Sequence, residues 1–81
     1  MKVIVYSSGG CGFCIKQKEF LIEKGIPFEE RDINTNDQYY QEFKELAGRG
    51  VPFTIVKEAG EIVSTVTGFN REELSKVLLQ Q

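Results

Sequence analysis

The segment around Cys11 and Cys14 constrains the fold more than any other part of this 81-residue chain. Before it, residues 2–6 form a mostly β-branched run, which predicts a short buried strand. After it, residues 15–24 are mostly good helix formers, and Gly25 is typical of a helix C-terminus. Both cysteines are therefore expected where a strand passes into the first turn of a helix.

A second strand is predicted directly after this helix, over residues 26–33. Pro27 lies at the start of the segment, where its missing N–H group disturbs strand pairing least. A strand, a helix and a strand within so few residues require a parallel pair joined by a right-handed crossover. The first part of the chain is therefore predicted to be a βαβ unit.

The next predicted elements are a second helix and a hairpin. The polar residues 34–37 can turn the chain and cap a helix over residues 38–47. Residues 53–57 are predicted as a strand, residues 58–61 as a turn, and residues 62–66 as the returning strand of a hairpin. These segments add one helix and an antiparallel pair of strands to the βαβ unit.

A last helix is predicted over residues 71–79. Asn70 is a good N-cap residue, and Glu73 follows three residues later, as in a capping box. With this helix the element order becomes βαβαββα, in a chain whose length allows one hydrophobic core. We therefore expect a single α/β domain over residues 1–81.

The spacing of apolar residues along the first helix predicts which side chains face the core. The predicted buried stripe consists of Cys14, Ile15, Leu21 and Ile22. Phe13 and Phe20 fall off this stripe. We therefore expect Phe13 to be partly exposed beside Cys11, as a substrate contact or as a simple surface aromatic.

The position of Cys11 at a helix start predicts a reactive thiolate. The first N–H groups of a helix have no internal partner, and the helix dipole adds partial positive charge there. Both effects favour the anion and lower the pKa of the thiol from its usual value of about 8.5. Cys14, one turn later, can attack a mixed disulfide formed at Cys11. We predict that Cys11 is the nucleophile and Cys14 the resolving thiol.

Three other interpretations of the cysteine pair compete with redox chemistry. A structural disulfide across so short a loop would remove only about 2 kcal/mol of unfolded-chain entropy. A zinc site normally needs four Cys or His ligands, and a chain with two cysteines and no histidine cannot supply them alone. The third interpretation is a pair of inert buried cysteines. The strand, the glycines and the helix around the pair favour redox chemistry, and no metal site is expected.

Composition excludes several other functions. Ten basic and twelve acidic residues give a net charge of −2 at pH 7, which argues against nucleic-acid binding. No apolar run approaches the roughly 18 residues of a membrane span, and a strand that begins after Met1 leaves no space for a signal peptide. Two cysteines in such a chain are typical of a reducing cytoplasm. We expect a cytoplasmic monomer that binds neither nucleic acid nor membrane.

The complete pattern resembles the glutaredoxin family along the whole chain, and it is similar also to the NrdH-redoxin branch. Cys11-Gly12-Phe13-Cys14 matches the dithiol motif of the family, and Val51-Pro52 matches its Val-Pro element, in which the proline is cis. The resemblance implies a thioredoxin-like, three-layer fold with a four-stranded mixed sheet flanked by helices. It also implies a thiol–disulfide oxidoreductase with a Cys11–Cys14 dithiol/disulfide cycle.

The resemblance further implies a surface for substrate or glutathione beside the cysteines. The backbone of Val51 would pair with an extended glutathione or peptide backbone, like an added strand. The turn before the last helix would hold the γ-glutamyl carboxylate at free helix N–H groups. The residues implied in binding are Gly12, Phe13, Arg49, Val51, Pro52, Gly68, Phe69 and Asn70.

Three positions differ from the common glutaredoxin pattern. Ser8 stands where a lysine is common, Gly50 where a threonine is common, and Gly12 where a proline is common. These differences predict weaker glutathione recognition. The expected reductant is therefore either glutathione, another low-molecular-weight thiol, or an enzyme of the thioredoxin reductase type.

Several functions stay open within this resemblance. The expected substrates are disulfide-containing proteins, low-molecular-weight disulfides or glutathionylated proteins, with no bound cofactor and with glutathione or another thiol as co-substrate. One alternative is an NrdH-like electron donor to ribonucleotide reductase. A second is a glutathione-dependent iron–sulfur cluster carrier formed by two chains. A third is a binding module of this fold whose cysteines are incidental.

Overall fold

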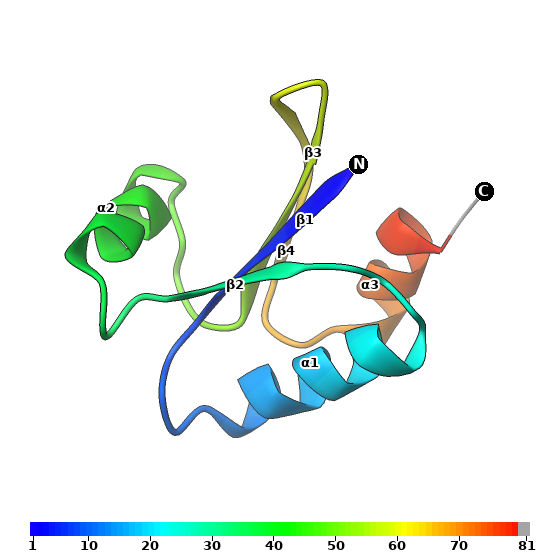
Figure 1. The fold of residues 1–81 in the computed structure, drawn as a ribbon, viewed down its shortest axis with the longest axis horizontal. Helices are drawn as coiled ribbons and strands as arrows, with labels where there is room; N and C mark the ends of the chain where they lie inside the picture. The colour runs from blue at the N-terminus through cyan, green and yellow to red at the C-terminus, as the bar shows by residue number, and fades with distance from the viewer. Residues whose placement is uncertain (80–81) are drawn as a thin grey trace.

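The computed structural model describes residues 1–79. Its elements are β1 (Lys2–Ser7), α1 (Gly12–Glu23), β2 (Glu29–Asp32), α2 (Asp37–Glu45), β3 (Phe53–Glu58), β4 (Glu61–Thr67) and α3 (Arg71–Leu78) (Figure 1). This is the predicted order βαβαββα. No helix in the described part of the chain is long and apolar enough to cross a membrane.

The four strands form one mixed sheet with the order β2-β1-β3-β4. β1 and β2 are parallel, as the βαβ prediction requires, while β1–β3 and β3–β4 are antiparallel. β1 therefore lies inside the sheet, where both of its faces are covered. This burial explains why β1 is a continuous apolar run rather than an alternating one.

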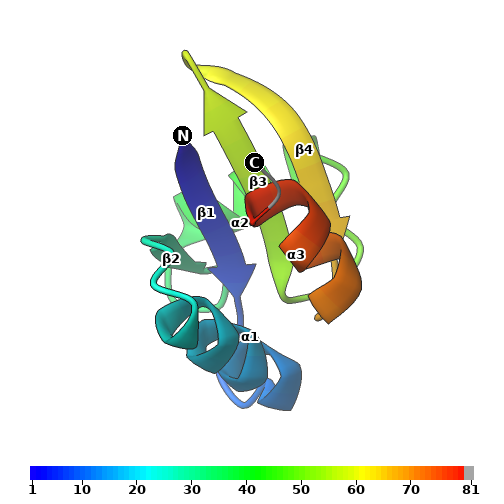
Figure 2. The same cartoon turned by 90° about the vertical axis from the view of Figure 1, so that its right-hand side faces the viewer.

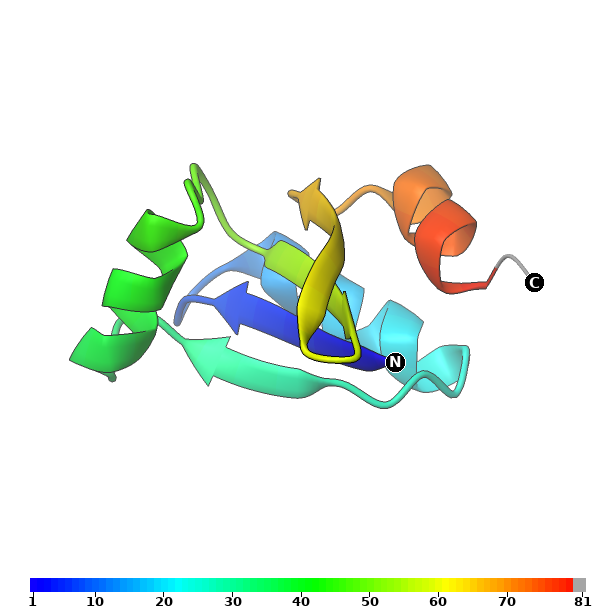
Figure 3. The same ribbon diagram turned by 90° about the horizontal axis from the view of Figure 1, so that it is seen from above.

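The helices cover the two faces of the sheet unequally. Figure 3 shows α2 on one side of the sheet, and Figure 2 shows α1 and α3 together on the other. Because successive strand residues point to opposite faces, Val3 and Val5 pack toward α1 and α3, whereas Ile4 and Tyr6 pack toward α2. The face covered by α1 and α3 is called the cysteine face below, and the opposite one the α2 face.

The buried side of α1 differs from the predicted stripe. Ile15 and Ile22 are 53% and 70% exposed, whereas Gln17 and Phe20 are buried with Cys14 and Leu21. The reason is tertiary: Gln17 meets a polar partner on β3, and Phe20 packs edge-on against Phe69, with ring centroids 6.2 Å apart. Hydrophobic spacing within one helix cannot anticipate either contact.

β2 begins at Glu29, later than predicted, because Ile26 and Phe28 pack into the core instead of joining the sheet. The N–H group of Ile26 donates to Leu21 O at 2.9 Å, which ties this residue to the C-terminal turn of α1. Ile26 is buried in the core of the cysteine face, with Phe28 packed beside it. Ile26 and Phe28 are apolar because the loop between α1 and β2 packs into the core, not because they pair in the sheet.

The end of α2 also differs from the prediction, which placed it at Ala47. The helix ends at Glu45, and Ala47 has a positive φ of 61°. The N–H group of Gly48 then donates to Phe43 O at 2.9 Å. A Cβ atom on Gly48 would collide with the ring of Phe43. Glycine is therefore required here by close packing rather than by its own φ.

The hairpin and the last helix agree with the prediction apart from their bounds. β3 and β4 extend to Glu58 and from Glu61, so the turn is the two residues Ala59 and Gly60, both with positive φ. Asn70 caps α3, since its Oδ1 accepts from the N–H group of Glu73 at 3.0 Å. α3 ends at Leu78, one residue earlier than predicted.

Candidate active site

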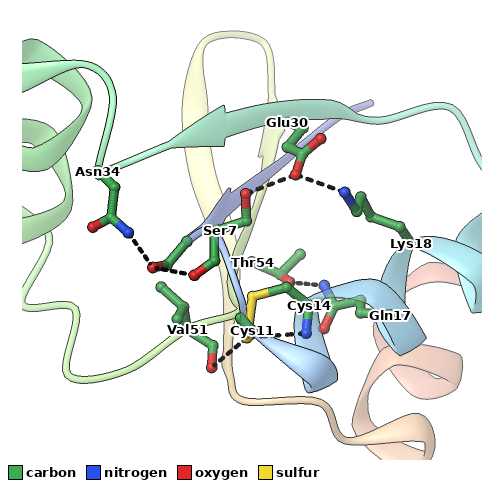
Figure 4. The surroundings of a disulfide bond; sticks show 11 residues. Ser7, Cys11, Cys14, Gln17, Lys18, Glu30, Asn34, Val51 and Thr54 are labelled. Atoms are coloured by element: carbon green, nitrogen blue, oxygen red, sulfur yellow. Dashed lines mark hydrogen bonds and ion pairs between the residues drawn. A yellow bond between two sulfur atoms is a disulfide. The ribbon is translucent and has the colours of Figure 1, made fainter.

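Cys11 and Cys14 form a disulfide at the point where β1 passes into α1 (Figure 4). Their Cα atoms are 5.2 Å apart. Cys11 is the N-cap residue of α1 and is partly exposed, whereas Cys14 is only 2% exposed. The two sulfur-bearing residues are thus unequal, and an approaching molecule meets Cys11 first.

The start of α1 provides a hydrogen bond to the accessible sulfur. The backbone N–H of Cys14 donates to Cys11 Sγ at 3.1 Å. The first turn of α1 carries no acidic residue, so nothing in that turn offsets the positive end of the helix dipole. In the reduced protein the same N–H group and dipole would favour a thiolate at Cys11.

The loop before Cys11 is held in place by short polar contacts. Gly10 has a φ of 76°, a conformation that favours glycine. The N–H group of Cys11 then donates to Ser8 O at 3.3 Å, and Asn34 Nδ2 donates to Ser8 Oγ at 2.6 Å. Ser8, at the position where the lysine of the family pattern would lie, therefore ties the cysteine loop to the segment after β2.

A small charged cluster lies close to this loop on the cysteine face. Glu30 accepts from Ser7 Oγ at 2.8 Å and from Lys18 Nζ at 2.9 Å (Figure 4). The hydrogen bond from Lys18, followed by the one from Ser7, lowers the pKa of the Glu30 carboxyl. Residues 1–79 contain no group of three or more His, Cys, Asp or Glu side chains placed to hold a metal ion.

The Val51-Pro52 segment, which lies between α2 and β3 in the chain, also comes close to Cys11. Its peptide bond is cis, as the resemblance implied. The carbonyl oxygen of Val51 lies 3.8 Å from Cys11 Sγ, and Pro52 is fully buried. The N–H group of Gly68 donates to Pro52 O at 2.7 Å. This bond joins the turn before α3 to the segment beside the cysteines, so three predicted parts of the site meet.

The remaining predicted binding residues differ in how far they are exposed to solvent. Gly12 and Phe13 are exposed, with Phe13 at 60% as expected, and together with Lys16 they line a depression of about 200 Å³. Phe69 is partly buried and lines a neighbouring groove of about 350 Å³ between α1 and the start of α3. Arg49 is exposed in the loop before Val51.

Two buried polar residues beside Cys14 were missed by sequence reasoning. Gln17 and Thr54 are both fully buried, and Gln17 Nε2 donates to Thr54 Oγ1 (Figure 4). One signal was present in the sequence: Gln17 is three residues after Cys14, and so shares its helix face. A second was that Thr54 is two residues after Pro52, and so shares its side of the chain.

Comparisons with known proteins point to one family and one fold. The family model for glutaredoxin matches residues 3–59. An uncharacterized glutaredoxin-like 8.6 kDa protein in the rubredoxin operon of Clostridium pasteurianum is 31% identical over 91% of this chain and 93% of its own length. The crystal structure of the thioredoxin-like protein BC3987 is 27% identical, with a TM-score of 0.81, over 95% of this chain and 100% of that one.

A further solved structure, of NrdH-redoxin from Escherichia coli, has a TM-score of 0.82 over 95% of each chain. Its sequence identity is 17%, so this likeness concerns the fold alone. The mixed four-stranded sheet with its three helices is therefore a thioredoxin-like arrangement.

Proposed function

We propose, from the premise that the chain belongs to the glutaredoxin family, that it catalyses thiol–disulfide exchange through Cys11 and Cys14. The observation that carries this proposal is the asymmetry of the pair. Cys11 caps a helix and accepts a backbone hydrogen bond at its sulfur, while Cys14 is buried one turn further on. An exposed, stabilised thiolate next to a protected second thiol is the arrangement that two-step exchange requires.

The reaction proceeds in two exchange steps. The Cys11 thiolate attacks one sulfur of a substrate disulfide, a Cys11–substrate disulfide forms, and the other substrate sulfur leaves as a thiolate. Cys14 loses its proton to solvent and attacks Cys11 Sγ. The Cys11–Cys14 disulfide forms, the second substrate sulfur leaves as a thiolate, and two electrons have passed from the protein to the substrate.

Substrates are proposed to be disulfide-containing or glutathionylated proteins that dock along the Val51 backbone. Val51 lies beside the reactive sulfur, so an extended chain whose disulfide reaches Cys11 also reaches the Val51 backbone. Exposed Phe13 and the depression around it would contact the flanking residues of such a substrate.

The proposed reductant is an enzyme of the thioredoxin reductase type, with glutathione as the weaker alternative. Ser8 and Gly50 supply neither the charge nor the hydroxyl that the family pattern has at these positions. A charge-assisted contact to a carboxylate is typically worth about 1.5–3 kcal/mol, so its absence weakens glutathione binding. A reductase that contacts a wider surface depends less on one such contact.

The test offers the oxidised protein NADPH together with either thioredoxin reductase or glutathione and its reductase, and follows NADPH loss. We expect turnover with a protein disulfide as final acceptor, faster with thioredoxin reductase. The matched control is Cys14→Ser, which should stop at the mixed disulfide with that acceptor. Absence of NADPH consumption in both systems would contradict the proposed function, and a brown, dimeric protein would indicate the cluster carrier instead.

A further inference from the structure

A buried acceptor without a partner lies beside the disulfide. Gln17 Nε2 donates to Thr54 Oγ1, but the other polar atom of the same amide, Oε1, has no hydrogen-bond partner among residues 1–79. Both side chains are fully buried. Because buried polar atoms are nearly always paired, an isolated one beside a candidate active site is a natural place for a functional contact.

The sulfur of Cys14 is our candidate for that partner. Gln17 follows Cys14 by three residues on α1, so the two side chains lie on the same face of the helix. Figure 4 shows the hydrogen-bonded Gln17 and Thr54 side chains in the same region as Cys14, where α1 meets β3. Cys14 itself is 2% exposed, so water has little access to its sulfur.

The need for a partner at Cys14 changes with the oxidation state. In the disulfide, Cys14 Sγ carries no proton and has nothing to donate. Reduction places a thiol there, which is a hydrogen-bond donor in a buried position. The resolving step then requires a thiolate at the same atom, which is costly to form away from water unless a donor faces it.

We propose that Gln17 is a positioning residue for Cys14, with Thr54 holding its amide. In the dithiol protein Gln17 Oε1 accepts from the Cys14 thiol, while Nε2 donates to Thr54. When Cys14 ionises, the side-chain amide of Gln17 flips, which exchanges the positions of Nε2 and Oε1. Nε2 then donates to the thiolate, and Oε1 accepts from the Thr54 hydroxyl. A threonine hydroxyl both donates and accepts, so Thr54 supports either orientation.

This inference rests on the proposed function and specifies how its second step is favoured. Gln17 takes no proton, since an amide is neutral; the Cys14 proton passes to solvent on the side of the partly exposed Cys11. The proposed pairing also affects the balance of oxidation states, because it gives Oε1 a partner in the dithiol that it lacks beside the disulfide. Removal of the amide should therefore make the reduction potential more negative.

The experiment follows exchange with an aromatic disulfide whose thiolate product is coloured. One product molecule is released when Cys11 attacks and the second when Cys14 resolves, so a stopped-flow trace separates the two steps. The variants are Gln17→Met and Thr54→Val, which keep the side-chain size but remove the polar groups. Thr54→Ser keeps the hydroxyl and serves as the matched control.

We expect the second phase to slow by about tenfold at neutral pH in Gln17→Met, with a smaller effect in Thr54→Val, because a hydrogen bond to a charged group is lost. The pH at which the second phase reaches half its maximal rate should rise in both variants. The first phase should be unchanged, and Thr54→Ser should behave as wild type. If Gln17→Met does not fold, the comparison of Thr54→Val with Thr54→Ser tests the proposal.

The outcomes separate this inference from the proposed function. Wild-type protein that releases both products, with second phases and pH midpoints unchanged in the variants, would leave the function standing and overturn the role of Gln17. Equal slowing of both phases would overturn it as well, since a general loss of structure would then be the cause. Wild-type protein that releases no product would overturn both.

Discussion

The two faces of the sheet differ in chemistry at the level of the disulfide. On the cysteine face, the side chains next to Cys14 are the polar pair Gln17 and Thr54. On the α2 face, Tyr6, Phe43 and Phe53 form an aromatic cluster with ring centroids 5.7–6.3 Å apart. Neighbouring residues of one strand, Phe53 and Thr54, thus enter an apolar and a polar environment respectively.

The polar side chains on the α2 face form hydrogen bonds with one another. Tyr6 donates its hydroxyl to Glu42 Oε1 at 3.0 Å, and Arg31 donates to the same oxygen at 2.7 Å. Burial, followed by the hydrogen bond with Glu42, raises the pKa of Tyr6. The hydrogen bond with Glu29 raises the pKa of Arg31 further above its already high value. Both pKa shifts keep Tyr6 protonated and Arg31 charged across the neutral range.

The comparison suggests a division: the cysteine face carries reactivity, and the α2 face carries stability. The largest expected effect tests it directly. Cys11→Ser should reduce disulfide exchange to background because the nucleophile is lost, while the unfolding free energy of the reduced protein should hardly change. Exchange assays and urea unfolding of both proteins in reductant would measure the two quantities.

The matched variant on the α2 face is Glu42→Gln. It removes the charge that pairs with Arg31 and should cost about 1 kcal/mol of unfolding free energy, with the exchange rate per folded molecule unchanged. The division fails if Glu42→Gln slows exchange as strongly as it lowers stability.

The next effect concerns packing at the end of α2. In Gly48→Ala the new Cβ atom meets the ring of Phe43, which is buried in the aromatic cluster and cannot easily move. We expect a loss of about 1–3 kcal/mol in unfolding free energy. Gly50→Ala is the control, because a Cβ atom there has no atom within 4 Å. Equal stability of the two variants in urea unfolding would show that the cluster yields to the new methyl group.

A smaller effect is expected when charge is restored on the cysteine face. Ser8→Lys places a cation near the proposed glutathione position and should raise the rate with glutathionylated substrates several-fold, consistent with about 1 kcal/mol of gained interaction. Ser8→Met is the neutral control, since it loses the contact with Asn34 equally. The rate with thioredoxin reductase should hardly change. A gain in Ser8→Met equal to that in Ser8→Lys would exclude charge as the cause.

The smallest effect is a dependence of stability on pH through Glu30. Its pKa is lowered in the folded protein, so its contribution is present above the unfolded value of about 4.3 and is lost as pH falls through the folded value. The difference in melting temperature between wild type and Glu30→Gln should therefore shrink between about pH 6 and about pH 3. A difference that stays constant over this range would mean that the contact with Lys18 contributes nothing.

Much of this arrangement could be predicted from local sequence signals. The uninterrupted apolar run of β1, the helix start at Cys11 and the cap at Asn70 each depend on a few neighbouring residues. The cis bond before Pro52 followed from family resemblance and not from composition. The strand, the helix start and the cap could be predicted because each depends only on residues within its own segment.

The contacts that were missed depend on how side chains pack in three dimensions rather than on the residue pattern of one segment. The burial of Gln17 depends on Thr54, and the need for glycine at position 48 depends on where the Phe43 ring lies. Ile15 and Ile22 were assigned to the core from the helical spacing of apolar residues, yet both are exposed and Gln17 is buried instead. Which side chains are buried at these positions is decided by packing between the sheet and the helices, so the pattern within one segment does not predict it.

The short strand β2 has a consequence for how copies of this protein behave at high concentration. It forms one edge of the sheet, and the unpaired backbone groups of an edge can recruit another chain. All four of its residues, Glu29, Glu30, Arg31 and Asp32, are charged. A second copy pairing along this edge would have to desolvate those charges and break the ion pairs that hold them. Aggregation through this edge is therefore disfavoured, whatever the oxidation state of the cysteines.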